Sequence, residues 1–267
     1  TQNNLGVVQR TIGERLDGEV GLEALRSAEA SYRAALEVRT REALPVAWAM
    51  TQNNLGNVQS ITGERLDGEV GLAALRSAEA SYRAALEVHT REALPVAWAT
   101  TQNNLGNVQH AIGQRLDGEV GLEALRSAEA SYRAALEVRT REALPVDWAM
   151  TQSNLGGVQH AIGERLEGEV GLEALRSAEA SYRAALEMHT RGAMPVDWAM
   201  TQSNLGGVQH TIGERLDGEV GLEALRLAEA SYRAALEVYT RETMPAYWCV
   251  VSKNLNVVQT LLAERGG

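Results

Sequence analysis

Three histidines recur at one position of successive sequence repeats, and imidazole nitrogens are common zinc ligands. They are His110, His160 and His210, and zinc requires nitrogen ligands at about 2.0–2.1 Å. A separation equal to the repeat period predicts that they lie on equivalent helices, with another helix between each pair. The axes of such helices lie beyond the ~8–10 Å of direct packing, so the three rings cannot converge on one ion. We therefore expect no metal site.

The other reactive residue types form no catalytic constellation. Cys249 is the only cysteine, stands beside Trp248 and has no equivalent in other copies of the repeat, which favours a packed thiol over a nucleophile. The segment LDGEVG at 66–71 lacks the Lys and Ser/Thr of a phosphate-binding loop and is typical of a turn. Trp48 and Tyr82 recur at fixed repeat positions, which indicates a core rather than a cofactor pocket. We expect no enzymatic activity, no catalytic residue and no cofactor.

An asparagine stands at one position of every copy, in the middle of an expected helix. Asparagine costs up to ~0.7 kcal/mol relative to alanine there, and a local rule broken in every copy suggests a compensating role. A side-chain amide offers a donor and an acceptor, as a peptide unit does, so the series could hold an extended chain through its backbone. The alternative is a hydrogen bond between helices that only sets their stacking. This asparagine ladder comprises Asn4, Asn54, Asn104, Asn154, Asn204 and Asn254.

A repeat of 50 residues positions these side chains. The copies span 1–50, 51–100, 101–150, 151–200 and 201–250, and a degenerate sixth copy gives a terminal helix at 251–267. A period of this length is typical of a solenoid, in which each unit buries its apolar face against its neighbours. The sequence predicts a single array over 1–267.

Each copy predicts two helices, which we expect at 46–65 and 72–92 in the second copy. Pro45 suits a first helical turn, and Trp48, Leu55 and Val58 fall on one face of the first helix. Glutamate and arginine alternate four residues apart along the second helix, which is typical of a solvated outer ridge. The ridge comprises Glu79, Arg83, Glu87 and Arg91, and the apolar stripe comprises Leu72, Leu75, Ala78, Tyr82, Ala85 and Leu86.

The pattern resembles the tetratricopeptide repeat, whose signature residues are matched by Leu55, Gly56, Ala78, Tyr82, Ala85 and Pro95. The period is longer than the family's, Trp48 comes one helical turn early, and Gln52 and Gln59 occupy the family's Trp and Tyr places. The segments AWAMTQNNLG and RAALEVRTREALP resemble the longer repeats of kinesin light chains and their bacterial relatives. The resemblance implies an all-α, right-handed superhelical solenoid whose first helices line a concave groove that holds an extended peptide. The asparagine ladder is similar to those of O-GlcNAc transferase and kinesin light chains.

Differences between copies gather on one stripe of the first helix, whereas the outer ridge of the second helix is nearly unchanged. Their spacing of three or four residues keeps them on one face. By the resemblance, this variable stripe is the peptide groove; the alternative is drift on an exposed face. Together with the ladder, the expected groove residues are Asn53, Asn54, Asn57, Asn103, Asn104, Asn107, His110, Asp147, Met150, Ser153, Asn154, His160, Asp197, Met200, Ser203, Asn204 and His210.

The net charge of the chain and the residues of the variable stripe restrict the kind of partner that we expect. Lys and Arg number 25 against 35 Asp and Glu, a net charge of −10, which argues against nucleic acid and against anionic membrane surfaces. The stripe contains aspartates and no strong basic clamp, so we expect a neutral to weakly basic extended segment of a protein partner. A single cysteine suits a reducing compartment, and we expect a cytoplasmic location.

Two alternatives to a peptide-binding scaffold stay open. The first is a structural protein that self-associates through uncapped ends, where the apolar Leu261 and Leu262 of the terminal helix would be exposed. The second is an accessory segment of a larger signalling or protease chain.

Overall fold

The computed structural model describes residues 1–266, which form eleven helices and no strand. The all-α prediction and the 50-residue period are confirmed. The first helices of the repeats are α1 (Gln2–Arg15), α3 (Pro45–Arg65), α5 (Pro95–Arg115), α7 (Pro145–Arg165), α9 (Pro195–Arg215) and α11 (Pro245–Gly266). The second helices are α2 (Gly18–Val38), α4 (Gly68–Leu86), α6 (Gly118–Leu136), α8 (Gly168–Leu186) and α10 (Gly218–Leu236).

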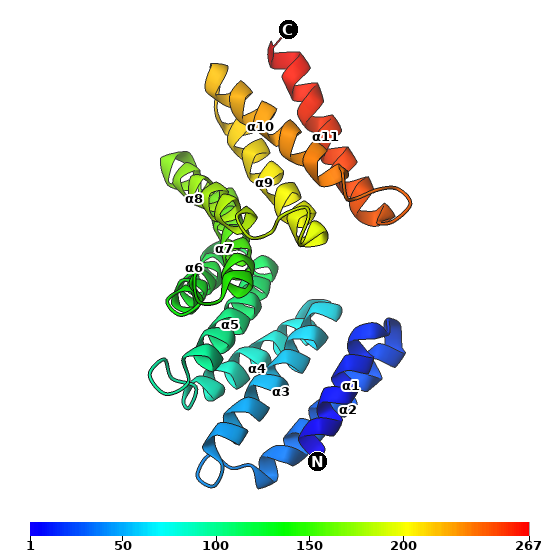
Figure 1. Cartoon of the computed structure of the whole chain (residues 1–267), viewed down its shortest axis with the longest axis vertical. Coiled ribbons are helices and arrows are strands. Elements are labelled where there is room, and N and C mark those ends of the chain that lie inside the picture. Colours follow the sequence, from blue (N-terminus) through cyan, green and yellow to red (C-terminus); the bar gives the residue numbers. More distant parts are fainter. Residues whose placement is uncertain (267) are drawn as a thin grey trace. The chain divides into compact units, whose positions relative to one another are not determined.

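The chain comprises two compact units, Thr1–Val138 with α1–α6 and the part from Arg139 onward with α7–α11. In the first unit α1 pairs with α2, α3 with α4 and α5 with α6, and α2 and α4 each also pack on the first helix that follows them (Figure 1). In the second unit α8 packs on both α7 and α9, and α10 on both α9 and α11. Within each unit, helical hairpins therefore pack on their neighbours, as a repeat array requires.

The second helix of each repeat is shifted toward the N-terminus relative to the expected 72–92. α4 begins at Gly68, whose φ of +61° favours glycine, so the predicted loop shrinks and Gly71 is helical. A Cβ on Gly71 would lie 1.9 Å from the Leu66 carbonyl oxygen, which explains the glycine there. α4 ends at Leu86, and the hydroxyl of Thr90 accepts the Ala93 backbone N–H at 3.2 Å in the turn that leads to Pro95.

Within each unit, the core clusters lie between a second helix and the first helix that follows it. Leu55 and Val58 of α3 pack on Leu25 and Tyr32 of α2, and all four side chains are buried. Within a hairpin the contact is closer still, since a Cβ on Gly56 would lie 2.7 Å from the Tyr82 ring. The predicted packing face and the role of small residues in close approach are confirmed here.

Trp48 is half-buried at the edge of that core rather than inside it, and the equivalent Trp198 packs against the core cluster that contains Leu225 and Tyr232. The expected packing role of this tryptophan is therefore confirmed only in part. Trp48 lies in the first turn of α3, where the guanidinium carbon of the loop residue Arg41 stands 6.0 Å from its ring centroid. The ring is therefore half-buried between protein and solvent, an arrangement that suits a cation–π contact. The equivalent Trp98, Trp148, Trp198 and Trp248 are half-buried too.

The outer ridge of the second helix also forms ion pairs with neighbouring repeats. Glu79 and Arg83 form the expected pair within α4, at 2.8 Å. Glu87, however, pairs with Arg41 of the preceding repeat, and Glu137 pairs with Arg91 in the same way. These side chains are about half exposed, so each pair contributes only ~0–1 kcal/mol, but it links neighbouring repeats.

The terminal helix differs from the expectation of an exposed apolar end. Leu261 and Leu262 of α11 pack against a cluster that contains Leu225, Tyr232 and Val258. They are half-buried because α11 covers α10 as α3 covers α2, α5 covers α4 and α9 covers α8. The expectation that these two leucines form a free adhesive surface is wrong.

Among residues 1–266, no helix has the length and apolar run that a bilayer crossing requires.

Candidate functional site: the variable stripe of the first helices

The predicted groove residues fall into three classes of exposure. Asn103 and Ser153 are buried and closed to a ligand, because this position faces the next repeat: its equivalent Asn3 accepts a hydrogen bond from Thr51 at 3.2 Å. Four are exposed: Asn107, Met150, Met200 and Asn204. The rest are half-buried: Asn53, Asn54, Asn57, Asn104, His110, Asp147, Asn154, His160, Asp197, Ser203 and His210.

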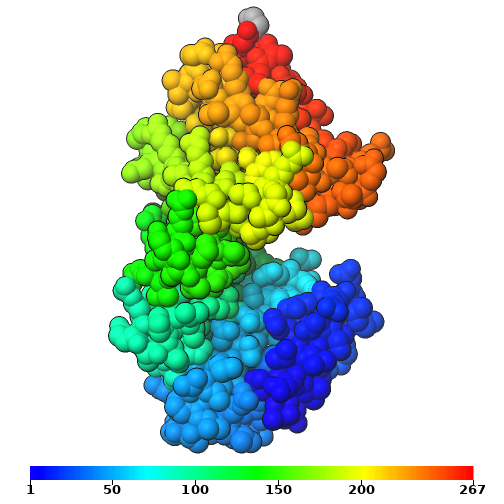
Figure 2. All heavy atoms as spheres, viewed as in Figure 1, coloured from blue at the N-terminus to red at the C-terminus, as the bar shows by residue number. Residues whose placement is uncertain are grey.

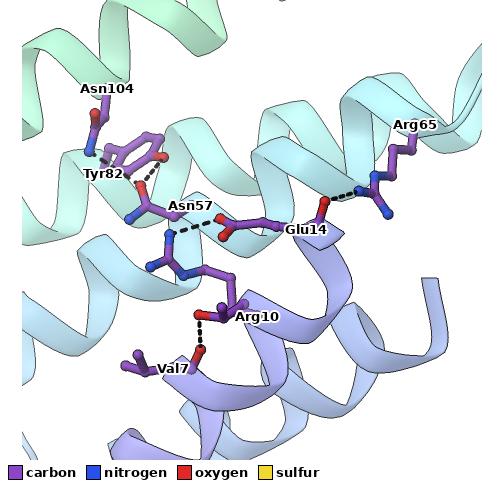
Figure 3. Close-up of polar contacts among 8 residues, drawn as sticks. Val7, Arg10, Glu14, Asn57, Arg65, Tyr82 and Asn104 are labelled. Carbon is purple, nitrogen blue, oxygen red and sulfur yellow. Dashed lines mark hydrogen bonds and ion pairs between the residues drawn. The ribbon is translucent and has the colours of Figure 1, made fainter. Parts of the chain in front are cut away.

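One member of the asparagine ladder, Asn104, hydrogen-bonds to the preceding repeat. The amide nitrogen of Asn104 on α5 donates to Asn57 Oδ1 at 3.2 Å and to Asn53 Oδ1 at 3.4 Å, both on α3. The Tyr82 hydroxyl donates to the same Asn57 oxygen at 2.7 Å, so three elements meet at one acceptor (Figure 3). The stacking role that the sequence left open is therefore present at Asn104.

The Tyr82 side chain in this cluster is buried, and its hydroxyl is hydrogen-bonded to Asn57. Burial raises the pKa of Tyr82 far above its ordinary value, so its hydroxyl stays protonated and must donate. The next repeat repeats the pair, with the Tyr132 hydroxyl donating to Asn107 at 2.8 Å. In the last repeat, where Gly207 has no side chain to offer, burial raises the pKa of Tyr232 to about 12, and the nearby Asn254 partly opposes this shift.

A polar hollow of about 320 Å³ opens beside this cluster in the first unit. Arg10 and Glu14 form an ion pair at 3.0 Å at its edge (Figure 3). Ser60 donates to Glu64 at 3.0 Å. The hollow thus presents several amides, one carboxylate and one guanidinium. Its lining residues are Arg10, Asn57, Ser60, Ile61, Glu64, Tyr82, Asn104 and Asn107.

A second hollow, of about 310 Å³, lies on the same stripe in the second unit but has an apolar lining. Tyr239 and Tyr247 stack there with ring centroids 4.9 Å apart. Met200 and Val250 are exposed at its rim. The other lining residues are Ser203, Asn204, Ala246 and Val251.

The variable residues Asp147 and Asp197 stand at repeat junctions rather than alone. Asp147 lies 3.8 Å from the buried Arg139, whose guanidinium also donates to Thr151 at 3.0 Å. In the next copy His189 replaces the arginine and contacts Thr201 at 3.0 Å, and the nearby Asp197 partly opposes the lowering of the His189 pKa that burial causes. Part of the variation on the stripe therefore follows the packing of successive repeats.

The three aligned histidines contact their own neighbours. His160 Nε2 lies 3.2 Å from Thr211 Oγ1 and 3.7 Å from Glu164, and burial lowers its pKa despite the glutamate. His210 lies 3.6 Å from Glu214 in the same arrangement. No group of three or more His, Cys, Asp or Glu side chains within residues 1–266 is placed to hold a metal ion.

The helices α3, α5, α7 and α9 each bury a glutamine that the sequence pattern did not mark as a contact residue. Gln109 Oε1 accepts the Ser131 hydroxyl at 2.8 Å, and its amide nitrogen donates to Glu79 of the preceding repeat at 3.2 Å. The pattern also did not mark the arginine that ends each first helix, although Arg65 donates to the carbonyls of Leu16 and Glu14 in the repeat before it. One available signal was the degenerate sixth copy, which keeps both residues as Gln259 and Arg265.

No protein-family model matches the chain, and no curated protein matches it. Its class therefore follows from its own structure: an all-helical protein of 50-residue hairpin repeats whose regular pairing is compatible with tetratricopeptide-like repeats.

Proposed function

We propose that the protein is a non-catalytic scaffold that binds an extended segment of a partner protein along the variable stripe of its first helices. The observation that carries the proposal is that both hollows open on this stripe. Asn57, Asn104 and Asn107 line the first hollow, and Met200, Ser203 and Asn204 line the second. Helical repeats generally use such repeated surfaces to bind elongated ligands.

The proposal includes the finer assignments that the resemblance implies. The chain would be a tetratricopeptide-like protein with a right-handed superhelical arrangement, and its location would be cytoplasmic. The regular helix pairing and the half-exposed asparagines support the first assignment, and the single cysteine supports the second.

Charge supports a neutral to weakly basic ligand. Carboxylates stand along the stripe at Glu64, Asp147, Glu164, Asp197 and Glu214. The cations near them are already engaged, since Arg10 pairs with Glu14 and Arg139 is buried beside Thr151. These carboxylates would repel an acidic segment and attract a basic one.

The ladder can serve stacking and binding together. Asn104 uses its amide nitrogen inside the protein, and its amide oxygen accepts no hydrogen bond from residues 1–266. A peptide N–H is a suitable donor for that oxygen. The half-exposed Asn104 and the exposed Asn204 are the members best placed to contact a backbone.

A selection from linear peptides displayed on phage, with the full chain as bait, tests the proposal. Enriched peptides are synthesised with a fluorophore and titrated by anisotropy against the wild type and against the triple variant Asn104→Ala, Asn154→Ala, Asn204→Ala. We expect neutral or basic sequences that bind the wild type saturably and bind the triple variant at least about tenfold more weakly.

The matched control replaces three exposed glutamates of the second helices, Glu123→Ala, Glu173→Ala and Glu223→Ala. This variant should bind as the wild type does. Failure of every enriched peptide to bind saturably would contradict the proposal, and so would equal binding by the ladder variant. A ladder variant that melts well below the wild type and still binds would assign the asparagines to stacking alone.

A further inference from the structure

The apolar hollow between α9 and α11 is a specialisation of the last copy of the repeat. At four other junctions an arginine or histidine contacts a threonine at this place, as His189 does Thr201 at 3.0 Å. Here Tyr239 and Val251 replace both partners, so an apolar wall stands where the other junctions have a polar contact. Five of the eight residues that line the hollow differ from the preceding copy: Tyr239, Ala246, Tyr247, Val250 and Val251.

The hollow has a buried floor and an exposed rim. Tyr239 and Val251 are 1% and 2% exposed, and the Tyr247 ring stacks on Tyr239 with centroids 4.9 Å apart. At the rim Met200 is 40% exposed, Tyr247 54% and Val250 58%. In Figure 2 the yellow start of α9 and the orange start of α11 adjoin at the surface of the second unit. A bulky apolar side chain that entered the hollow would exchange water for apolar atoms on several sides, which is favourable.

The stripe positions that form this rim are open in the interior of the array as well. Met150 and Met200, the equivalents of Val250, are both 40% exposed, although α8 packs on α7 and α10 packs on α9. Asp197, the equivalent of Tyr247, is half-buried. A second helix that packed on α11 as α8 packs on α7 would therefore leave the hollow open.

A carboxylate stands beside the hollow. Asp197 lies one helical turn before Met200 on α9, so the two side chains occupy one face of that helix. Burial raises the pKa of Tyr239 to about 12, and Tyr247 and the negative charge of Asp197 add to this shift. The carboxylate is therefore close to the floor of the hollow as well as to its rim.

Within residues 1–266, no cation forms an ion pair with Asp197. At the preceding junction Arg139 lies 3.8 Å from the equivalent aspartate, but its counterpart beside Asp197 is His189. Burial lowers the pKa of His189 below the ordinary 6.5, so this ring is neutral at neutral pH. Lys253 of α11 occupies a position whose equivalent Asn3 contacts the following repeat, so it lies on the side of α11 away from α9.

We propose that this hollow selects an extended partner segment in which a bulky apolar residue and a lysine or arginine stand two positions apart. The apolar side chain enters between Met200, Tyr247 and Val250, and the cation pairs with Asp197. Alternate residues of an extended chain point to the same side ~6.4–6.8 Å apart, which is close to the ~5–6 Å between side chains one helical turn apart. This inference rests on the proposed function, since it names the segment that the stripe binds at α9 and α11.

Parallel selections of random linear peptides displayed on phage test it, with the full chain and two variants as bait. The variants are Tyr247→Ala and Asp197→Ala, and the chain itself carries alanine at this repeat position as Ala47 and Ala97. We expect the wild type to enrich peptides with the apolar-x-basic pattern, read in either direction. Tyr247→Ala should lose the apolar preference, whereas Asp197→Ala should keep it and lose the basic preference.

Anisotropy titrations then use the most enriched peptide that carries the pattern, labelled with fluorescein, and a version with glutamine in place of its basic residue. Tyr247→Ala should weaken both peptides several-fold. Asp197→Ala should weaken only the first, because the glutamine version has no cation for the carboxylate. Val170→Ala is the matched control, since Val170 is an exposed valine of α8 outside the stripe, and it should bind both peptides as the wild type does. Circular dichroism should show wild-type helicity for all three variants.

The outcomes separate this inference from the scaffold function. Peptides that bind the wild type saturably but lack the pattern, or that bind both variants as tightly as the wild type, would overturn the inference and leave the scaffold function standing. Equal losses of the two peptides on Asp197→Ala would overturn the pairing of the cation with this carboxylate. Selections that yield no saturably binding peptide would overturn both proposals.

Discussion

The side-chain amide of Gln109 joins two repeats, because its nitrogen donates to Glu79 Oε1 at 3.2 Å while its oxygen accepts from Ser131 in its own repeat. Gln109 is 4% exposed, so the bond to a carboxylate is shielded from water on one side. Charge-assisted hydrogen bonds of this kind are stronger and more directional than neutral ones. The same contact joins Gln59 to Glu29, Gln209 to Glu179 and Gln259 to Glu229. These four junctions therefore share a polar contact that favours one register of packing.

The first prediction concerns a variant that lacks the Gln109 amide and its two hydrogen bonds. Gln109→Ala leaves the buried Ser131 hydroxyl without its acceptor and should lower the free energy of unfolding by ~1–3 kcal/mol. Urea unfolding followed by circular dichroism measures the change. Gln114→Ala on the same helix is the control, because Gln114 is exposed and should shift the transition little. Equal effects of the two substitutions would show that the buried amide adds nothing to stability.

The repeat architecture was predictable, because period and helix type follow from patterns that the chain repeats. Leu55, Val58, Leu72 and Leu75 recur at helical spacing, and the structure buries all four. The boundaries of the second helix were not predictable in the same way. They depend on a positive φ at Gly68 and on the close contact of Gly71 with a carbonyl, and neither has a periodic signature.

The junction contacts were harder to predict, because they join residues on different helices. Comparison with the tetratricopeptide pattern marked Gln59 only as a departure, although it is the residue that bonds to Glu29. One signal was present in the copies: the last repeat changes two positions together, to Tyr239 and Val251, and the structure buries both at one junction. The stripe itself could be placed from the spacing of the variable residues, but the burial of Asn103 and Ser153 could not.

The second prediction compares two adjacent glycines of α9. A Cβ on Gly206 would lie 2.9 Å from the Tyr232 ring, so Gly206→Ala should force the two helices of the hairpin apart and destabilise the chain. A Cβ on Gly207 would meet nothing closer than 3.6 Å, so Gly207→Ala should gain up to ~1 kcal/mol from helix propensity. Thermal melts should therefore shift in opposite directions. A shift of the same sign for both would contradict the packing of Tyr232 on α9.

The third prediction concerns acidification. Burial lowers the pKa of His89 and of His189 below the ordinary 6.5, so both are neutral in the folded chain at neutral pH. The unfolded state binds more protons below about pH 6.5, and stability contributed by the neutral rings should fall from there toward the lowered pKa. The double variant His89→Gln, His189→Gln should lose less melting temperature than the wild type between about pH 7.5 and 5.5. Identical pH profiles would show that neither ring resists protonation.

The last prediction tests whether the variable junction residues are coupled. His189 and Thr201 are both buried, with His189 Nδ1 3.0 Å from Thr201 Oγ1, and the next junction has Tyr239 and Val251 at these positions. Thr201→Val alone leaves the imidazole nitrogen without its partner and should cost ~1–3 kcal/mol. His189→Tyr alone places a larger ring against a hydroxyl and should also destabilise the chain.

The double variant His189→Tyr, Thr201→Val recreates the pair of the last junction and should be more stable than the sum of the single effects predicts. A double-mutant cycle from urea unfolding should give a coupling of at least ~0.5 kcal/mol, as expected for residues in contact. Thr201→Ser keeps the hydroxyl and serves as the control, since it should retain most of the stability that Thr201→Val loses. Effects that add within ~0.5 kcal/mol would mean that the two positions vary independently. In that case the variation on the first helices would not follow junction packing, and ligand contact would remain its physical explanation.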